Sequence, residues 1–214
     1  MARGRLHIVV TAGPTREYID PVRFLSNESS GRMGFAIAAE GVRRGHKVTL
    51  IAGPVHQDTP KGVRRIDVMS ARDMLAAVRT AFGKADALIM AAAVADFRPK
   101  RKLAGKWRKK DDGREVASLE LVRNPDILQT VARRKGSRLV VSFALETGDG
   151  LRRARRKLQA KNADFIVLND DSALNAARAS VTILDSEGGV RHLASARKEV
   201  LAKSVIGLLD DRPT

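Results

Sequence analysis

The 214-residue chain has no cysteine, which excludes disulfides, zinc–thiolate sites and a cysteine nucleophile. Its four histidines are scattered without a metal-ligand spacing, so no protein-held metal site is expected. Aromatic residues make up only 4% of the chain, with one Trp and one Tyr, so the stacking platforms of RNA and single-strand binders are scarce. The N-terminal apolar run, residues 6–10, is too short to span a membrane and lacks the features of a secretory signal. A cytoplasmic protein without membrane contact is expected.

Acidic residues are also under-represented, because 24 Asp and Glu stand against 40 Lys and Arg, for a net charge of +16. Such a balance favours anionic partners. Two kinds of partner compete, namely nucleic acid and small phosphorylated substrates. No helix-turn-helix, zinc-finger or RRM signature is present, so nucleic acid is the less favoured of the two.

Strands and helices alternate along most of the chain, which predicts an α/β fold with a Rossmann-like, doubly wound and mostly parallel sheet. Buried strands are expected at residues 6–11, 47–52, 63–68, 87–93, 138–143 and 164–168. Residues 181–184 and 190–193 flank a Gly-Gly turn and predict a hairpin. Helices are expected at 32–44, 70–82, from Pro125 as first residue, at 149–161, and at 195–209 with Ser195 as N-cap.

The middle of the chain breaks this alternation. Residues 97–114 are polar, basic and without periodicity, which predicts a mobile flap. Residues 116–122 then alternate as a strand. No internal repeat or domain linker is visible, so residues 1–214 are expected to form a single domain.

The first candidate site is a glycine-containing loop after the first strand that leads into a helix. Such a helix start presents backbone N–H groups and a positive dipole end to a phosphate. The spacing is too long for a G-x-G-x-x-G dinucleotide fingerprint, and an ordinary loop is the competing interpretation. The residues proposed for this phosphate and substrate loop are Gly13, Ser29, Ser30, Gly31 and Gly34.

Four further segments could contribute to a site at the same sheet edge, where ligands of doubly wound folds bind. Each also has a purely structural explanation: close packing for the alanine-rich run, a solvated loop for the basic run, capping for the helix start, and exposure on the surface for the two lysines. The segments are the alanine-rich run 90–96, the basic run 106–110, the helix start 121–128, and the pair Lys157 and Lys161.

Seven motifs taken together resemble phosphopantothenoylcysteine synthetase, the bacterial domain that is often fused to a flavin-dependent decarboxylase. They cover nearly the whole chain in order. The 214 residues include no decarboxylase half, so either a stand-alone enzyme or one domain of a bifunctional protein is expected. The motifs are Thr11-Ala-Gly-Pro-Thr-Arg-Glu, Asp20-Pro-Val-Arg, Ser26-Asn-x-Ser-Ser-Gly-x-Met-Gly, Ala92-Ala-Val-Ala-Asp, Arg123-Asn-Pro-Asp-Ile, Ser142-Phe-Ala-x-Glu-Thr and Lys157-x-x-x-Lys-Asn.

The resemblance implies a two-step ligation. CTP, accompanied by Mg²⁺, activates the carboxylate of 4′-phosphopantothenate as an acyl-cytidylate, and the amine of cysteine then displaces CMP. Bacterial motifs favour CTP over ATP. The resemblance also implies a homodimer, with residues 116–122 at the interface.

The resemblance assigns roles residue by residue. Asn27 would support the acyl-cytidylate and its attack by cysteine, and Lys106 would be the flap lysine against the triphosphate. The amide of Asn27 could do so by donating a hydrogen bond to a carbonyl oxygen of the substrate. The remaining nucleotide contacts would be Ala92, Asp96, Pro125, Asp126, Ile127, Leu128, Phe143, Lys157 and Lys161. No motif identifies the residues that hold the pantothenate phosphate, for which Arg16 and Arg23 are hypotheses based on charge.

The main alternative is a Rossmann-type oxidoreductase that binds NAD(P). Such an enzyme needs an acidic residue at the end of its second strand. Here that strand ends Leu50-Ile-Ala-Gly, which counts against this alternative. A basic nucleic-acid-binding module is the second alternative.

Overall fold

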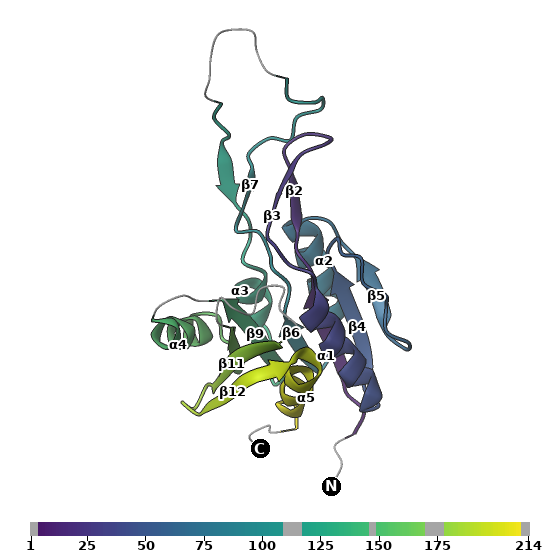
Figure 1. Ribbon diagram of the computed structural model, residues 1–214, viewed down its shortest axis with the longest axis vertical. Helices are drawn as coiled ribbons and strands as arrows, with labels where there is room; N and C mark the ends of the chain where they lie inside the picture. Colours follow the sequence, from purple (N-terminus) through teal and green to yellow (C-terminus); the bar gives the residue numbers. More distant parts are fainter. Residues whose placement is uncertain (1–3, 109–116, 146–148, 170–177, 211–214) are drawn as a thin grey trace.

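The computed structural model describes residues 4–108, 117–145, 149–169 and 178–210. An eight-stranded sheet in the order β12-β11-β10-β9-β6-β1-β4-β5 forms the centre (Figure 1). Six strands are parallel and β11 and β12 are antiparallel, which confirms the predicted Rossmann-like, mostly parallel architecture. The strands are β1 His7–Ala12, β4 Lys47–Ala52, β5 Arg64–Asp67, β6 Ala87–Met90, β9 Leu139–Leu145, β10 Phe165–Asn169, β11 Arg178–Asp185 and β12 Val190–Arg197.

Helices cover both faces of the sheet. Because side chains alternate along a strand, Ile8 and Val10 of β1 face α1 (Arg32–Arg43) and α5 (Lys198–Gly207), whereas Val9 faces α2 (Ala71–Phe82), α3 (Ile127–Ala132) and α4 (Gly150–Ala160). Burial on both faces explains the unbroken apolar character of the parallel strands. In the part of the chain that the structure describes, no helix is long and apolar enough to cross a bilayer.

The chain reverses direction across the sheet between β1 and β6. From β1 the chain continues to β4 on one side, whereas β6 is followed by β9 on the other. The loops after these two strands are joined by backbone hydrogen bonds, including Ala93 N to the carbonyl of Gly13 at 2.9 Å. This is the switch point at which doubly wound sheets bind ligands.

Two short antiparallel ribbons stand above the sheet as an arm (Figure 1). One ribbon pairs β2 (Arg16–Tyr18) with β3 (Phe24–Ser26), and the other pairs β7 (Phe97–Pro99) with β8 (Leu121–Arg123). The N–H of Leu103 donates to the carbonyl of Ile19 at 2.8 Å and joins the ribbons. The predicted flap therefore begins with a strand, because residues 97–99 find a pairing partner that local periodicity does not reveal.

Several predicted boundaries were wrong. The strand expected over 116–122 begins only at Leu121. Residue 116 and the flap segment 109–114 lie outside the described residues. Strand β6 ends at Met90 instead of continuing to residue 93. Pro125 is not the first helical residue, because the Asp126 side chain caps α3 by accepting from Gln129 N at 2.9 Å. Ser195 is not an N-cap; it lies within β12, and α5 begins at Lys198.

Other predictions of local structure were correct. Ser70 caps α2 in a full capping box with Asp73. The hairpin is present, but its strands are longer than expected: each has eight residues, and their register shifts between Ala179 and Val181.

Candidate functional site

Two adjoining cavities open near the carboxyl ends of β6 and β9. Their volumes are about 490 Å³ and about 550 Å³, within the range of small-molecule sites. They share the walls formed by Ala92, Val94, Asp96 and Phe143. A single ligand that passes beside these shared residues could therefore occupy both cavities.

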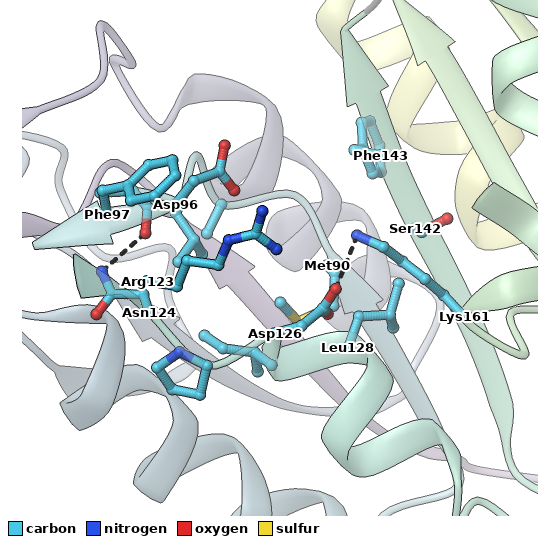
Figure 2. Close-up of a pocket in the computed structure, with 15 residues that line it drawn as sticks. Met90, Asp96, Phe97, Arg123, Asn124, Asp126, Leu128, Ser142, Phe143 and Lys161 are labelled. Carbon is cyan, nitrogen blue, oxygen red and sulfur yellow. Dashed lines mark hydrogen bonds and ion pairs between the residues drawn. The ribbon is translucent and has the colours of Figure 1, made fainter. Parts of the chain in front are cut away.

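The first cavity combines buried apolar surface with several polar side chains (Figure 2). Ile127 and Leu128 of α3 supply the apolar surface. Lys161 reaches in from the end of α4, and its Nζ lies 3.3 Å from the carboxylate of Asp126. Apolar surface beside groups that can form hydrogen bonds suits a flat heterocycle, which needs both contact area and orientation.

The alanine-rich loop between the cavities is held from behind by threonines of the first motif. Thr11 Oγ1 accepts from Ala92 N at 3.2 Å, and Thr15 Oγ1 accepts from Ala95 N at 3.0 Å. Both threonines are fully buried. Their role is thus to fix the loop backbone against the cavities, while the small alanine side chains allow a ligand to approach it.

The second cavity is built around the start of α1. Its N-cap, Gly31, has φ 73° and offers no side chain to the first turn of the helix. The N–H of Gly31 donates to Ser29 Oγ, and this hydrogen bond is long at 3.4 Å. The N-terminal N–H groups of α1 therefore face the cavity with the helix dipole, a favourable place for an anion.

Three cationic side chains line the second cavity, Arg32, Lys157 and Lys198, together with the carboxylates of Glu28 and Asp96. Burial lowers the pKa of Lys198, the positive charge of Arg32 lowers it further, and Glu199 opposes the shift. The cavity thus concentrates positive charge on partly desolvated groups, where it attracts an anion more strongly than in open solvent.

The structure brings most of the predicted site residues together. Ala92, Asp96 and Phe143 line both cavities. Pro125, Asp126, Ile127, Leu128 and Lys161 line the first, and Asn27, Ser29, Ser30, Gly31, Gly34 and Lys157 line the second.

Gly13 lies beneath the site instead of lining it. Its φ is 76°, and a Cβ there would lie 2.9 Å from Cγ1 of Val55. Gly34 lines the cavity but is also required for packing, since a Cβ would lie 2.5 Å from that of Ala12. Gly34 thus allows α1 to approach the end of β1 closely, and Gly13 allows the loop after β1 to pack against Gly53 and Val55.

Lys106 is exposed and lines neither cavity. The next residue, Trp107, is tied to the arm: its N–H donates to Asp20 at 3.0 Å, and its carbonyl accepts from Arg23 at 2.8 Å. Arg16 stacks on the ring of Phe24 at 4.4 Å. Neither arginine suggested for the pantothenate phosphate lines a cavity.

Asn27 is oriented by the alanine-rich loop. Its Nδ2 donates to the carbonyls of Ala93 at 3.2 Å and Val94 at 3.1 Å. An amide has two N–H donors, so both are used by the protein and Oδ1 remains to meet a substrate. This differs from the expectation that Asn27 donates to a substrate carbonyl.

Sequence reasoning missed four polar residues of the second cavity, Glu28, Arg32, Asn169 and Lys198. Arg32 directly follows the glycine of the predicted phosphate loop, and its place in the first turn of a helix was a usable signal. Asn169 ends β10, and its position at a carboxyl strand end was a signal too. Lys198 had no local signal, because it joins the site only through the antiparallel hairpin.

A site for a protein-held metal is not found. Within residues 4–108, 117–145, 149–169 and 178–210, no three His, Asp or Glu side chains group closely enough to bind a metal ion.

Known proteins resemble the chain in both sequence and fold. The family model for the DNA/pantothenate metabolism flavoprotein C-terminal domain matches residues 3–211. The coenzyme A biosynthesis bifunctional protein CoaBC of Bacillus subtilis (strain 168) is 47% identical over 192 residues, which are 87% of this chain and 47% of that protein. The corresponding protein of Escherichia coli (strain K12) is 48% identical over 168 residues, 78% of this chain and 41% of that protein.

Two solved structures share the fold. The crystal structure of the C-terminal domain of a CoaBC protein has a TM-score of 0.83 and 38% identity over 98% of each chain. The DNA/pantothenate metabolism flavoprotein from Streptococcus pneumoniae has a TM-score of 0.84 at 22% identity, over 96% of this chain and 99% of that one.

The chain spans about half the length, or less, of the curated relatives it matches. The matches confirm the resemblance inferred from the seven motifs and favour neither alternative, the NAD(P) oxidoreductase or the nucleic-acid-binding module. With nearly all of its residues matched, the chain belongs to the DNA/pantothenate metabolism flavoprotein C-terminal domain family.

Proposed function

We propose that the protein is a phosphopantothenate–cysteine ligase that uses CTP and acts in coenzyme A biosynthesis. The observation that carries this proposal is the pair of adjoining cavities. The first joins buried apolar surface to hydrogen-bonding groups and is suited to a base, and the second has three cationic side chains beside a helix start and is suited to phosphates. Family membership supports the same activity. We further propose that the 214 residues act as one synthetase domain, in the cytoplasm and as a homodimer.

In the first step, a carboxylate oxygen of 4′-phosphopantothenate attacks the α-phosphorus of CTP. The bond from that phosphorus to the bridging oxygen of the β-phosphate breaks, and pyrophosphate leaves with the electron pair. The base would lie among Ile127, Leu128 and Phe143, and the phosphates beside Lys157 and the start of α1. Positive charge there stabilises the negative charge that develops on the leaving group.

In the second step, the amine of cysteine attacks the acyl carbon, the carbon–oxygen bond to the cytidylate breaks, and CMP leaves. The attacking nitrogen loses a proton, which passes to water. Oδ1 of Asn27, fixed by the bonds of Nδ2 to the loop, can accept a hydrogen bond from that amine and orient it.

Magnesium would accompany the triphosphate. Only two carboxylates, Glu28 and Asp96, line the second cavity, which fits an ion that keeps phosphate oxygens and water as its main ligands. Bound there, it would neutralise phosphate charge.

Lys106 would act from the flap. In the proposed mechanism, the flap leaves its contact with the arm and places the Lys106 ammonium against the α-phosphate. Lys106 is exposed and lines neither cavity, so the flap must move for the ammonium to reach the phosphate.

Pyrophosphate release tests the proposal directly. With CTP and phosphopantothenate alone, pyrophosphate should form and acyl-cytidylate should accumulate; adding cysteine should release CMP. ATP should support the reaction less well than CTP. Thermal stabilisation by NADPH or a short duplex, with none by CTP, would instead support one of the two alternatives.

A further inference from the structure

Lys198 is delivered to the second cavity by an irregular end of the β11–β12 hairpin. Ser195 has φ 43°, an uncommon value for a residue with a side chain. Its carbonyl accepts from Arg178 Nε at 2.8 Å, and its N–H donates to Ser180 Oγ at 3.0 Å. The register of the two strands shifts between Ala179 and Val181, so the pair bends where the chain turns into α5.

Helix α5 begins immediately after this bend, at Lys198, and packs beside α1 (Figure 1). Ala179, on the neighbouring strand, lines the same cavity. The bend therefore places Lys198, the first residue of α5, near Arg32, the first residue of α1. Lys198 and Arg32 both line the cavity.

Neither cation is held in an ion pair among the described residues, although the carboxylates of Glu28 and Asp96 line the same cavity. Burial and the positive charge of Arg32 lower the pKa of Lys198, and the charge of Glu199 opposes this shift without reversing it. Two like charges facing one cavity destabilise the folded protein unless an anion lies between them. The arrangement is thus built for a ligand of high negative charge.

The nucleotide proposed above supplies such a ligand. If its base occupies the first cavity and its α-phosphate lies at the shared wall of Asp96 and Phe143, the rest of the triphosphate extends into the second. The two distal phosphates carry more negative charge than the single phosphate of the acid substrate. They therefore match two cations and a helix N-terminus better.

We propose that Lys198 and Arg32 bind the β- and γ-phosphates of the nucleotide and stabilise pyrophosphate as it leaves. This inference rests on the proposed function. It adds the first residue of α5, which follows the C-terminal hairpin, to a site otherwise formed by the parallel strands and the segments that follow them.

The test compares nucleotides that differ only in their distal phosphates. Affinities for CTP and CMP are measured by calorimetry for the wild type and for Lys198→Met, which keeps an unbranched side chain but removes the charge. Lys203→Met is the matched control, because Lys203 is exposed on the same helix and lines neither cavity. We expect Lys198→Met to weaken CTP about tenfold or more and CMP less than about twofold, as for loss of a hydrogen bond to a charged group.

A second readout separates binding from folding. Without ligand, Lys198→Met should melt at or above the wild-type temperature, because the substitution removes a poorly solvated charge. The added stabilisation by CTP should nevertheless be smaller than in the wild type. Lys198→Arg should restore part of the CTP affinity.

Three results would overturn the inference while leaving the ligase intact: unchanged CTP affinity in Lys198→Met, an equal loss for CTP and CMP, or a loss of phosphopantothenate affinity instead. A wild-type protein that binds no CTP would overturn the proposed function itself.

Discussion

At the scale of single residues, Asn27 illustrates how the backbone determines what a side chain offers. Its two donors are held by the carbonyls of Ala93 and Val94. Asn27→Asp replaces those donors by a carboxylate that faces two carbonyl oxygens, so the side chain should move away. We expect the acyl-cytidylate to form in this variant but to transfer slowly to cysteine. Quenched reactions analysed by mass spectrometry would show the intermediate accumulating.

Asn27→Asp both removes the amide and adds a negative charge. Asn27→Ala separates these two effects, because it removes the amide without adding charge. Slow transfer in both variants would assign the defect to the missing amide. Wild-type turnover of cysteine by Asn27→Asp would contradict the role assigned to Asn27.

At the scale of secondary-structure elements, the flap is attached to the arm through one buried carboxylate. Asp20 is fully buried and accepts from the N–H groups of Val22, Arg23 and Trp107. Burial alone would raise the pKa of Asp20, but these hydrogen bonds and the charge of Arg23 outweigh it and hold the pKa below its ordinary value. The attachment is therefore present at neutral pH and weakens only in acid, as the carboxylate becomes protonated.

Trp107 is the only tryptophan of the chain, so its fluorescence reports on the flap. If the flap closes over the nucleotide, CTP binding should break the contact of Trp107 with Asp20 and shift its emission. Lys106→Ala should then slow acyl-cytidylate formation by roughly a hundredfold, the scale of losing one transition-state contact, without preventing the emission change. Normal pyrophosphate release by Lys106→Ala would contradict this mechanism.

Helix α1 contains a second buried carboxylate, with a different partner set. Hydrogen bonds from Arg43, opposed by burial and assisted by Arg44, lower the pKa of Glu40 from 4.5 to about 2. A carboxyl with a depressed folded-state pKa stabilises the protein above its ordinary pKa, and that stability is lost as the pH falls toward the folded value. The stabilisation should therefore be complete above about pH 5.

Glu40→Gln should lower the free energy of unfolding at pH 7 by roughly 1–2 kcal/mol, less than the full shift implies because solvent screens the exposed Arg43. The difference from the wild type should shrink between pH 4.5 and pH 2. Urea unfolding at pH 7, 4.5 and 3 would measure it. Glu187→Gln, in the exposed β11–β12 turn, is the control and should change the free energy of unfolding little at any of these pH values. If Glu40→Gln lowers the free energy of unfolding equally at all three pH values, the role assigned to the Glu40 carboxylate is wrong.

At the scale of the whole molecule, the arm carries large apolar side chains that are exposed in the single chain. They include Val22 at 61% exposure and Leu121 at 43%. Exposed apolar patches of this kind often mark contacts with other molecules. The strand expected at the dimer interface, residues 116–122, overlaps the arm only at its end, in β8.

We expect Val22→Lys combined with Leu121→Lys to convert the proposed dimer to a monomer in sedimentation velocity. Burying a lysine charge against apolar surface is costly, so the substituted faces should separate. Val190→Lys is the control, because the exposure of Val190, 47%, lies between those of Leu121 and Val22, but Val190 is at the hairpin turn away from the arm. A monomeric wild type, or a double variant that still sediments as a dimer, would contradict the placement of the interface.

Local sequence was sufficient for much of the fold. The β-branched run of β1 cannot be solvated on either face and so must be a central strand. Ser70 followed by Asp73 specifies a helix start by itself, because a capping box forms between residues three positions apart. Likewise, the carboxyl ends of parallel strands always lie at one edge of the sheet. The sequence alone therefore groups residues such as Asp96 and Phe143 into one site.

Tertiary structure alone decided the rest, since it depends on which distant segments meet. β7 became a strand only because residues 121–123 pair with it, and Lys106 was placed with the arm by the carboxylate of Asp20. Thr11 and Thr15 were directed at the loop backbone instead of the ligand. Lys198 reached the site through a strand bend held by Arg178, seventeen residues from Ser195. Hydrogen bonds and like charges across such separations leave no periodic pattern in the sequence, so only the folded chain reveals them.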